Sequence, residues 1–325
     1  MLAASSSSIL IRYAQQDGIA SLAIAAWRMV LASLVLLPMA LATRRREIRG
    51  LSPRSLLFAV VAGLFLAAHF TAWITSLEYT SVASSAALVT TNPVWVGLAT
   101  VLLFRERLPG LTIAGIAVSL LGCLLIIWVD AAAEPTVAGL AGAAAGATGA
   151  STATAATTAA GAAGAAGAAA AAGRQPMLGN SLALAGAVCI SAYLLTGRRI
   201  AASFSLLAYV TLVYGAAAVM LMLAAVAAGV ELWRYPATGW AALAGLALVP
   251  QLIGHTAFNW SLRRLSPTFV ALSILGEPVG SAILASLLFT EIPSALQLAA
   301  FATLLAGIAI AALGEHRAPR VAAAG

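Results

Sequence analysis

The sequence predicts an all-α polytopic membrane protein with ten transmembrane helices, arranged as two inverted five-helix repeats. Hydrophobic residues make up 62% of the 325 residues and charged residues only 8%, a balance too apolar for a water-soluble domain. The apolar residues gather in segments of about 20, the length that crosses a hydrocarbon core as a helix. These segments lack the alternation of apolar and polar residues expected for strands of a membrane barrel.

Ten spans follow from these segments. They cover residues 1–14, 22–42, 55–76, 83–104, 111–129, 178–197, 206–229, 238–261, 268–289 and 295–313. The first segment is short, because eleven residues precede Arg12 and make about half of a bilayer crossing. We interpret it as a truncated first helix with about ten residues upstream. A half-span tucked against its neighbours is the alternative.

A repeat relates the two halves of the chain. Residues 77–125 align without a gap with residues 262–310, at an offset of 185 positions. Five spans separate the two copies, so the copies face opposite sides of the membrane. The aligned pairs include Asn92-Pro93-Val94 with Glu277-Pro278-Val279, and residues 102–106 with residues 287–291. Inverted repeats with interrupted helices are typical of secondary transporters.

The chain therefore divides into four parts. They are a first repeat (1–130), an Ala/Gly/Thr-rich flexible linker (131–177), a second repeat (178–315) and a short cytoplasmic tail (316–325). In the linker, large apolar side chains are nearly absent and glycine recurs, at a cost of about 1 kcal/mol each in a helix. We predict a loop without a role in chemistry rather than an eleventh span. A partly helical segment is the alternative.

The basic residues set the predicted orientation, because all 17 of them are arginines at or near span ends. With the N-terminus inside, 13 arginines fall in inside loops and the C-terminal tail, and 4 fall outside. The positive-inside rule then places both termini in the cytoplasm of a protein of the cell (inner) membrane. The arginines do not form one face interleaved with aromatic residues, so the expected surroundings are membrane lipids and no nucleic acid.

Polar side chains inside the spans are the candidate binding residues, because lipid offers them no hydrogen-bond partner. Gln251, His255 and Asn259 are spaced i, i+4, i+8, which predicts one polar helix face lining a cavity or bonding another helix. His69 and Trp73 share a face of the third span, where His69 is either a site residue or a packing partner. The full set predicted to line a substrate cavity is His69, Trp73, Asn92, Gln251, His255, Asn259 and Glu277.

Glu277 lies near the middle of the ninth span, on one face with Ser273 and Ser281. It has two open roles. The functional role is a carboxyl group that lines the cavity and exchanges a proton during transport, which would make the proton the coupling ion. The structural role is local. Pro93 and Pro278 are predicted helix breaks, and each leaves a backbone carbonyl without its helical hydrogen bond, so that this carbonyl needs a polar neighbour.

Arg28 lies near the outer end of the second span. Snorkelling of its side chain toward the lipid headgroups is the simpler interpretation, and attraction of an anionic substrate group is the alternative. Gly115, Ser119 and Cys123 are spaced as small residues at a close helix contact.

Enzyme signatures are absent from the sequence. No Walker loop, GxSxG elbow, HExxH helix or dinucleotide fingerprint occurs, so we expect no catalytic residue, no cofactor and no ATP-driven pumping. No third ligand lies at metal spacing from the histidines, so no metal site is expected. Cys123 and Cys189 lie in apolar segments and are interpreted as packing residues.

The motifs together resemble the drug/metabolite transporter superfamily, in its ten-helix branch built from two EamA-type domains. The residues that carry the resemblance are Leu77-Glu78-Tyr79-Thr80-Ser81, Asn92-Pro93-Val94, Phe104-Arg105-Glu106-Arg107, Arg264-Leu265-Ser266, Glu277-Pro278-Val279, Glu291 and Arg28. The resemblance implies an inner-membrane carrier of small metabolites, often an exporter of amino acids or related compounds, with a central cavity between the two halves. The short first span and the long stretch 131–173 depart from the family pattern.

The leading functional hypothesis is a secondary transporter that works by alternating access. It predicts a cavity of several hundred Å3 on which the named polar groups converge. The alternative is a non-transporting membrane scaffold or lipid-binding subunit, which predicts tightly packed halves without a polar cavity.

Overall fold

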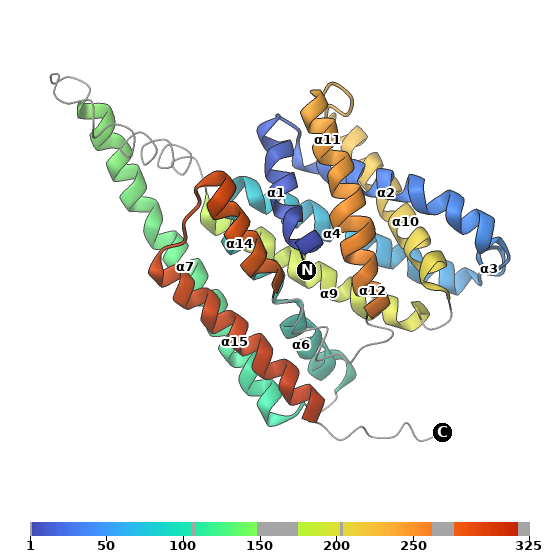
Figure 1. Cartoon of the computed structure of the whole chain (residues 1–325). Coiled ribbons are helices and arrows are strands. Elements are labelled where there is room, and N and C mark those ends of the chain that lie inside the picture. The colour runs from blue at the N-terminus through green and yellow to red at the C-terminus, as the bar shows by residue number, and fades with distance from the viewer. Residues whose placement is uncertain (1, 106–107, 148–174, 202–203, 262–275, 318–325) are drawn as a thin grey trace.

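The computed structural model describes residues 2–105, 108–147, 175–201, 204–261 and 276–317, and in these residues it is helical with no strand (Figure 1). The elements are α1 (Leu2–Gln16), α2 (Ser21–Thr43), α3 (Arg45–Arg49), α4 (Pro53–Tyr79), α5 (Val82–Val89), α6 (Asn92–Phe104), α7 (Gly110–Ala147), α9 (Pro176–Ala201), α10 (Leu206–Ala227), α11 (Ala237–Leu246), the π-helical η1 (Ala247–His255), α12 (Thr256–Ser261), α14 (Gly276–Phe289) and α15 (Ala295–Arg317).

Among the described residues, eight helical segments are long and apolar enough to cross a membrane, and α14 is a shorter apolar helix. With α1 they account for the ten predicted segments. Large apolar side chains on the outside of the bundle are widely exposed, including Leu102 at 73% and Leu287 at 74%. Such a surface is suited to lipid rather than to water.

Serine side chains start several of the helices. Ser52 accepts a hydrogen bond from the Ser55 amide at 3.1 Å, and Ser81 accepts one from the Ser84 amide at 3.0 Å. Each hydroxyl satisfies one amide that has no partner inside the helix, which fixes the point where the helix begins.

The offset of 185 positions recurs in the helix ends. The starts of α2 and α10, the starts of α7 and α15, the ends of α6 and α14, and the ends of α1 and α9 are each 185 positions apart. Arg105 and Thr290, which directly follow α6 and α14, have positive φ angles of 55° and 57° and are also separated by 185 positions. This conformation is rare for residues other than glycine, so its recurrence at counterpart positions shows that the repeat extends to backbone detail.

The helices α7 and α15 lie side by side along one edge of the molecule (Figure 1). A Cβ atom on Gly122 would lie 2.6 Å from the Cα atom of Leu304, and one on Gly307 would lie 2.6 Å from the Oγ atom of Ser119. Gly307 is the counterpart of Gly122, and Ser119 is the counterpart of Leu304. This exchange of counterparts is the contact pattern of a two-fold axis, and it supports the small-residue packing predicted for Gly115 and Ser119.

The broken helices of the two repeats run in opposite directions. The Val82 amide at the start of α5 donates to Glu291 Oε2 at 2.9 Å, just beyond the end of α14. Helix α5 also packs on α14. Because the start of one lies beside the end of the other, the two are antiparallel, as an inverted repeat requires.

The predicted break before Pro93 is present. Helix α5 ends at Val89 and α6 begins at Asn92, and the chain turns at Thr90 and Thr91 between them. The hydroxyls of these threonines donate to the carbonyls of Ala87 and Leu88. In the second repeat α14 begins at Gly276, two residues before Pro278. Residues 268–275 of the predicted ninth span, including Ser273, lie outside the described residues.

One boundary differs clearly from the predicted one. Helix α7 continues to Ala147, so residues 131–147 are helical, as the alternative interpretation of that stretch expected, and residues 148–174 lie outside the described part of the chain. Helix α1 packs against α14, α11 and η1, with Ala4 against Gly254 in the middle of the eighth span. It corresponds to the last fifteen residues of α9.

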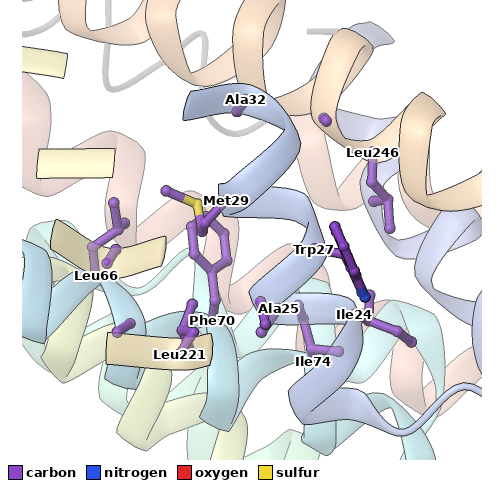
Figure 2. Packing of buried hydrophobic residues seen from close by; sticks show 14 of the residues in the cluster. Ile24, Ala25, Trp27, Met29, Ala32, Leu66, Phe70, Ile74, Leu221 and Leu246 are labelled. Carbon is purple, nitrogen blue, oxygen red and sulfur yellow. The ribbon is translucent and has the colours of Figure 1, made fainter. Parts of the chain in front are cut away.

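A buried apolar cluster joins α2, α4, α10 and α11 (Figure 2). In it Phe70 of α4 lies next to Met29 of α2, and both side chains are fully buried. The Trp27 indole also belongs to this cluster and donates to the Leu232 carbonyl at 2.8 Å. This packing fixes the positions of α2 and α4, which carry the residues of the site described next.

Candidate functional site

Arg28 projects from α2 into the interior and is 0% exposed. Its Nε donates to Gln251 Oε1 at 2.8 Å, and one terminal nitrogen donates to Ser7 Oγ at 2.8 Å. Its guanidinium carbon lies 4.2 Å from the ring centre of Phe70 and 5.8 Å from that of Trp73. The snorkelling interpretation is therefore wrong, because partners on α1, α4 and η1 hold the side chain inside the bundle.

We call these residues and the two histidines beside them the Arg28 cluster: Ser7, Arg28, His69, Phe70, Trp73, Gln251 and His255. It combines side chains from both repeats, since α1, α2 and α4 belong to the first repeat and η1 belongs to the second. Phe70 and His255 are counterparts at the offset of 185 and contact each other, with ring centres 5.6 Å apart. The pseudo-two-fold axis therefore passes beside the cluster.

The charge of Arg28 is not neutralised by direct pairing. The ion pair found in the described residues joins Arg12 and Glu291, and does not involve Arg28. Tyr214 and the half-buried Glu277 lie near enough to interact electrostatically with the guanidinium group, without an ion-pair contact. A buried cation without a paired carboxylate is unfavourable and is a common mark of a functional site in membrane proteins.

Three hydrogen-bond donors of the cluster have no acceptor among the described residues. They are Arg28 Nη2, Gln251 Nε2 and Trp73 Nε1, all buried. Tyr214 lies beside Gln251, but its hydroxyl makes no hydrogen bond of ordinary geometry. Buried polar atoms are nearly always paired, so the grouping of these donors around one guanidinium indicates a place for an acceptor.

The structure brings together four of the seven predicted residues: His69, Trp73, Gln251 and His255. His69 is 4% exposed and stacks on Trp73 with ring centres 5.7 Å apart. Its Nδ1 lies 2.9 Å from the Gly186 carbonyl of α9, so it is both a packing partner and a neighbour of the site.

The other three predicted residues lie apart from the cluster or at its margin. Asn259 accepts from Tyr193 at 3.2 Å and donates to the His255 carbonyl at 3.0 Å, so it serves helix packing. The Asn92 backbone carbonyl accepts from Ser191. The Glu277 carbonyl accepts from Ser5 at 3.2 Å, while its side chain acts on Arg28 only electrostatically.

The predicted i, i+4, i+8 face of the eighth span does not converge on one point. Pro250 lies in η1, whose π-helical turn is wider than that of an α-helix, so residues four apart no longer lie directly above one another. Gln251 therefore reaches Arg28, His255 reaches Phe70, and Asn259 reaches Tyr193 of α9.

A cavity of about 1020 Å3 opens at the end of the bundle that carries Glu291, which we call the Glu291 end. Polar residues from both repeats line it, among them Arg12, Gln15, Glu78, Glu291 and Gln297. None of the seven predicted site residues lines this cavity. Arg12 joins the repeats, because its Nη2 lies 3.3 Å from Glu291 Oε1 and donates to the Thr80 carbonyl at 3.1 Å.

Helix α1 connects the cavity with the Arg28 cluster through a polar face. Ser7 bonds Arg28, Ser8 is buried without a hydrogen-bond partner among the described residues, and Arg12, four residues on, reaches the cavity. The sequence carried a signal for this face that the predicted set omitted: four consecutive serines, Ser5 to Ser8, in an otherwise apolar segment. Within the described residues no group of three or more His, Cys, Asp or Glu residues could hold a metal ion.

A multi-pass helical membrane fold of two related halves, with a buried charged cluster where they meet, is typical of a secondary transporter. The chain belongs to the EamA-like transporter family, which matches residues 1–128 and 177–313. Family membership implies a small-molecule substrate and a membrane environment.

The fold is also found in solved structures, of which 22 chains match. One of them, described only as "Crystal structure of protein", matches with a TM-score of 0.56 and 19% sequence identity over 97% of each chain. At that identity the likeness supports the fold alone. The comparison with curated proteins returned no match.

Proposed function

We propose that the protein is a non-enzymatic secondary transporter that exports small organic metabolites, amino acids or related compounds, across the cytoplasmic membrane by alternating access. The observation that carries the proposal is the Arg28 cluster, a set of unpaired buried polar groups between the two repeats, below a cavity at one end of the bundle. A scaffold with tightly packed halves has no use for such an arrangement, because unpaired buried donors cost stability.

The orientation in this proposal rests on the arginines, of which 13 are predicted on the side that carries both termini and 3 on the other, while Arg28 is buried in the bundle. Both termini are then cytoplasmic, and the Glu291 end faces outward. The state described here has an open outer cavity and a closed cluster, since Arg28, Trp73 and Gln251 are at most 2% exposed.

The two repeats exchange access by rocking about the contact between α7 and α15. The glycines at this contact bring the two backbones together over several turns, so the contact stays in place while the repeats rotate about it. At the outer end the Arg12–Glu291 pair ties α1 to the connection between α14 and α15, and its release separates the repeats there.

The first test of the proposal is flux through purified protein in proteoliposomes. Liposomes are loaded with mixed amino acids and organic acids, and efflux is compared with that from protein-free liposomes. Cells that overexpress the chain are screened in parallel for resistance to toxic metabolite analogues. A purified, folded protein that moves none of these solutes would favour a scaffold.

We also propose the proton as the coupling ion, with Glu277 as the group that carries it. Glu277 is half-buried in the membrane-spanning region and interacts electrostatically with Arg28, so its charge and that of a substrate influence each other. The test is the response of flux to an imposed pH gradient. A Glu277→Gln protein whose flux still follows the gradient would exclude Glu277 from this role.

A further inference from the structure

The fully buried side-chain atoms of the Arg28 cluster that lack a partner among the described residues are all donors. We propose that the cluster binds the carboxylate group of an organic acid, held by Arg28 Nη2, Gln251 Nε2 and Trp73 Nε1. This inference rests on the proposed transport function and names its substrate class.

The charge balance of the cluster favours an anion. Within the described part of the chain, Arg28 is buried without a paired carboxylate, and the titratable groups that face it are Tyr214, His69, His255 and Glu277. Of these only Glu277 can offer a negative charge at neutral pH, and it makes no ion-pair contact. A bound carboxylate would supply both the missing charge and the missing acceptor atoms.

The geometry leaves one direction open for the ligand. Phe70 covers the face of the guanidinium group, while Nε and one terminal nitrogen are used by Gln251 and Ser7. The free Nη2 points along the edge of the plane, the edge by which arginine binds carboxylates. The Trp73 ring lies 5.8 Å from the guanidinium carbon and His69 stacks on Trp73, so the rest of the ligand meets an aromatic wall beside the cluster.

An entry route from the cavity at the Glu291 end runs along α1. Ser8 has no hydrogen-bond partner among the described residues, and it lies between Ser7 at the cluster and Arg12 at the cavity. Arg12, Glu78 and Glu291 all border this cavity, so the preference for an anion comes from the Arg28 cluster rather than from the mouth of the route.

The direct test is binding of acids and their neutral isosteres to the purified full chain, measured by isothermal titration calorimetry. The probes are 3-phenylpropanoate, indole-3-acetate and 4-methylpentanoate, each with its amide and with an amine of similar shape. We expect the acid to bind about 10-fold or more tightly than its amide, from the loss of a charge-assisted hydrogen bond. If no acid binds more tightly than its amide, or an amine binds best, the proposal is overturned.

Gln251→Glu is the most informative variant, because it places a carboxylate against Arg28 from within the chain. The change neutralises a buried charge, so the protein should fold, and it fills the site that the acid would occupy. We expect affinity for the best-binding acid to fall about 30-fold or more. Glu277→Gln removes a competing negative charge and should raise the same affinity. Unchanged affinity in Gln251→Glu contradicts the proposal.

A matched pair of tryptophan variants tests the third donor. Trp73→Phe keeps the ring and removes the N–H group, and should weaken acid binding about 5-fold. Trp27→Phe makes the same change in a residue whose N–H group donates to the Leu232 carbonyl, outside the cluster, and should leave acid affinity unchanged. Equal effects of the two variants would rule out a contact between Trp73 and the ligand.

Binding and flux separate this inference from the proposed function. An acid that binds but is not moved in proteoliposomes supports the carboxylate site and contradicts transport. Flux of neutral or cationic metabolites, with no preference for acids over amides, supports transport and overturns the carboxylate site.

Discussion

Along α7 and α15 the two repeats present counterpart positions to each other, whereas around Arg28 they present different residues. Gly122 of α7 contacts α15 at Leu304, and its counterpart Gly307 of α15 contacts α7 at Ser119. The counterpart of Arg28 is Val213, and the counterpart of Gln251 is Leu66. The first contact is a symmetric hinge made by small residues, and the second is an asymmetric polar site on the same axis.

An inverted repeat can acquire a specific site by changing side chains while its backbone stays symmetric. Symmetry of the backbone makes the inward-facing and outward-facing arrangements of the two halves similar in energy. A substrate has no such symmetry, so the residues that bind it must differ between the repeats. The cluster meets this need with a cation from one repeat and an amide from the other.

The symmetric contact should be the most sensitive to added volume. In Gly122→Ala the new Cβ atom would collide with the Leu304 backbone, and we expect a loss of about 3 kcal/mol in unfolding free energy. Unfolding in mixed detergent micelles measures it. The control is Gly215→Ala in α10, where nothing lies within 4 Å of the added atom. This control should be neutral or stabilising, and equal losses in both would remove the special status of the α7–α15 contact.

The asymmetric site should respond in the opposite way, with lost function and retained stability. Arg28→Met removes the anion-binding group, and we expect flux of the transported acid to fall about 100-fold. Unfolding free energy should change by less than about 1 kcal/mol, because relief of an unpaired buried charge offsets the lost hydrogen bonds. A loss as large as that of Gly122→Ala would make the cluster a structural element.

The Arg12–Glu291 pair lies between these extremes, since it links the repeats but borders the cavity. The side chains are 10% and 14% exposed, and we expect either Arg12→Gln or Glu291→Gln to cost about 1–2 kcal/mol. A double-mutant cycle measures their coupling, and additive effects would show that the pair does not tie the repeats together. High salt should weaken the coupling, because the cavity admits solvent ions.

The smallest effect is expected at the two residues of positive φ. Thr290→Gly and Arg105→Gly relieve a backbone conformation that glycine adopts readily, and each should gain about 0.5–1 kcal/mol. Because the two positions are counterparts, the two variants should gain similar amounts of unfolding free energy, measured in the same unfolding experiment. A gain in one variant and a loss in the other would show that the repeats differ at these turns.

Most of the fold was predictable from the sequence. Span length and apolar composition follow from the thickness of a bilayer, and the offset of 185 positions makes Gly122 and Gly307 counterparts. The break before Pro93 was predictable as well, because proline cannot donate the helical hydrogen bond. The helical extension of α7 to Ala147 was harder to predict, because alanine favours a helix in that stretch and glycine disfavours one.

The candidate site was predictable only in part. His69, Trp73, Gln251 and His255 were found because polar and aromatic residues are conspicuous in apolar helices. Arg28 was left out of the predicted set and snorkelling was preferred to its anion-binding alternative, because distance from a span end indicates whether a side chain can reach the headgroups and not whether partners hold it inside.

The sequence by itself determined the apolar segments, the repeat and the break before Pro93, since each depends on local composition and on spacing along one chain. Only the tertiary structure decided which polar groups meet. The π-helical turn at Pro250 directs Gln251 to Arg28 and Asn259 away from it, and Ser7 reaches Arg28 from a helix whose register depends on its packing against α14 and η1. Contacts between helices depend on rotation and depth of packing, which a sequence pattern of one helix does not specify.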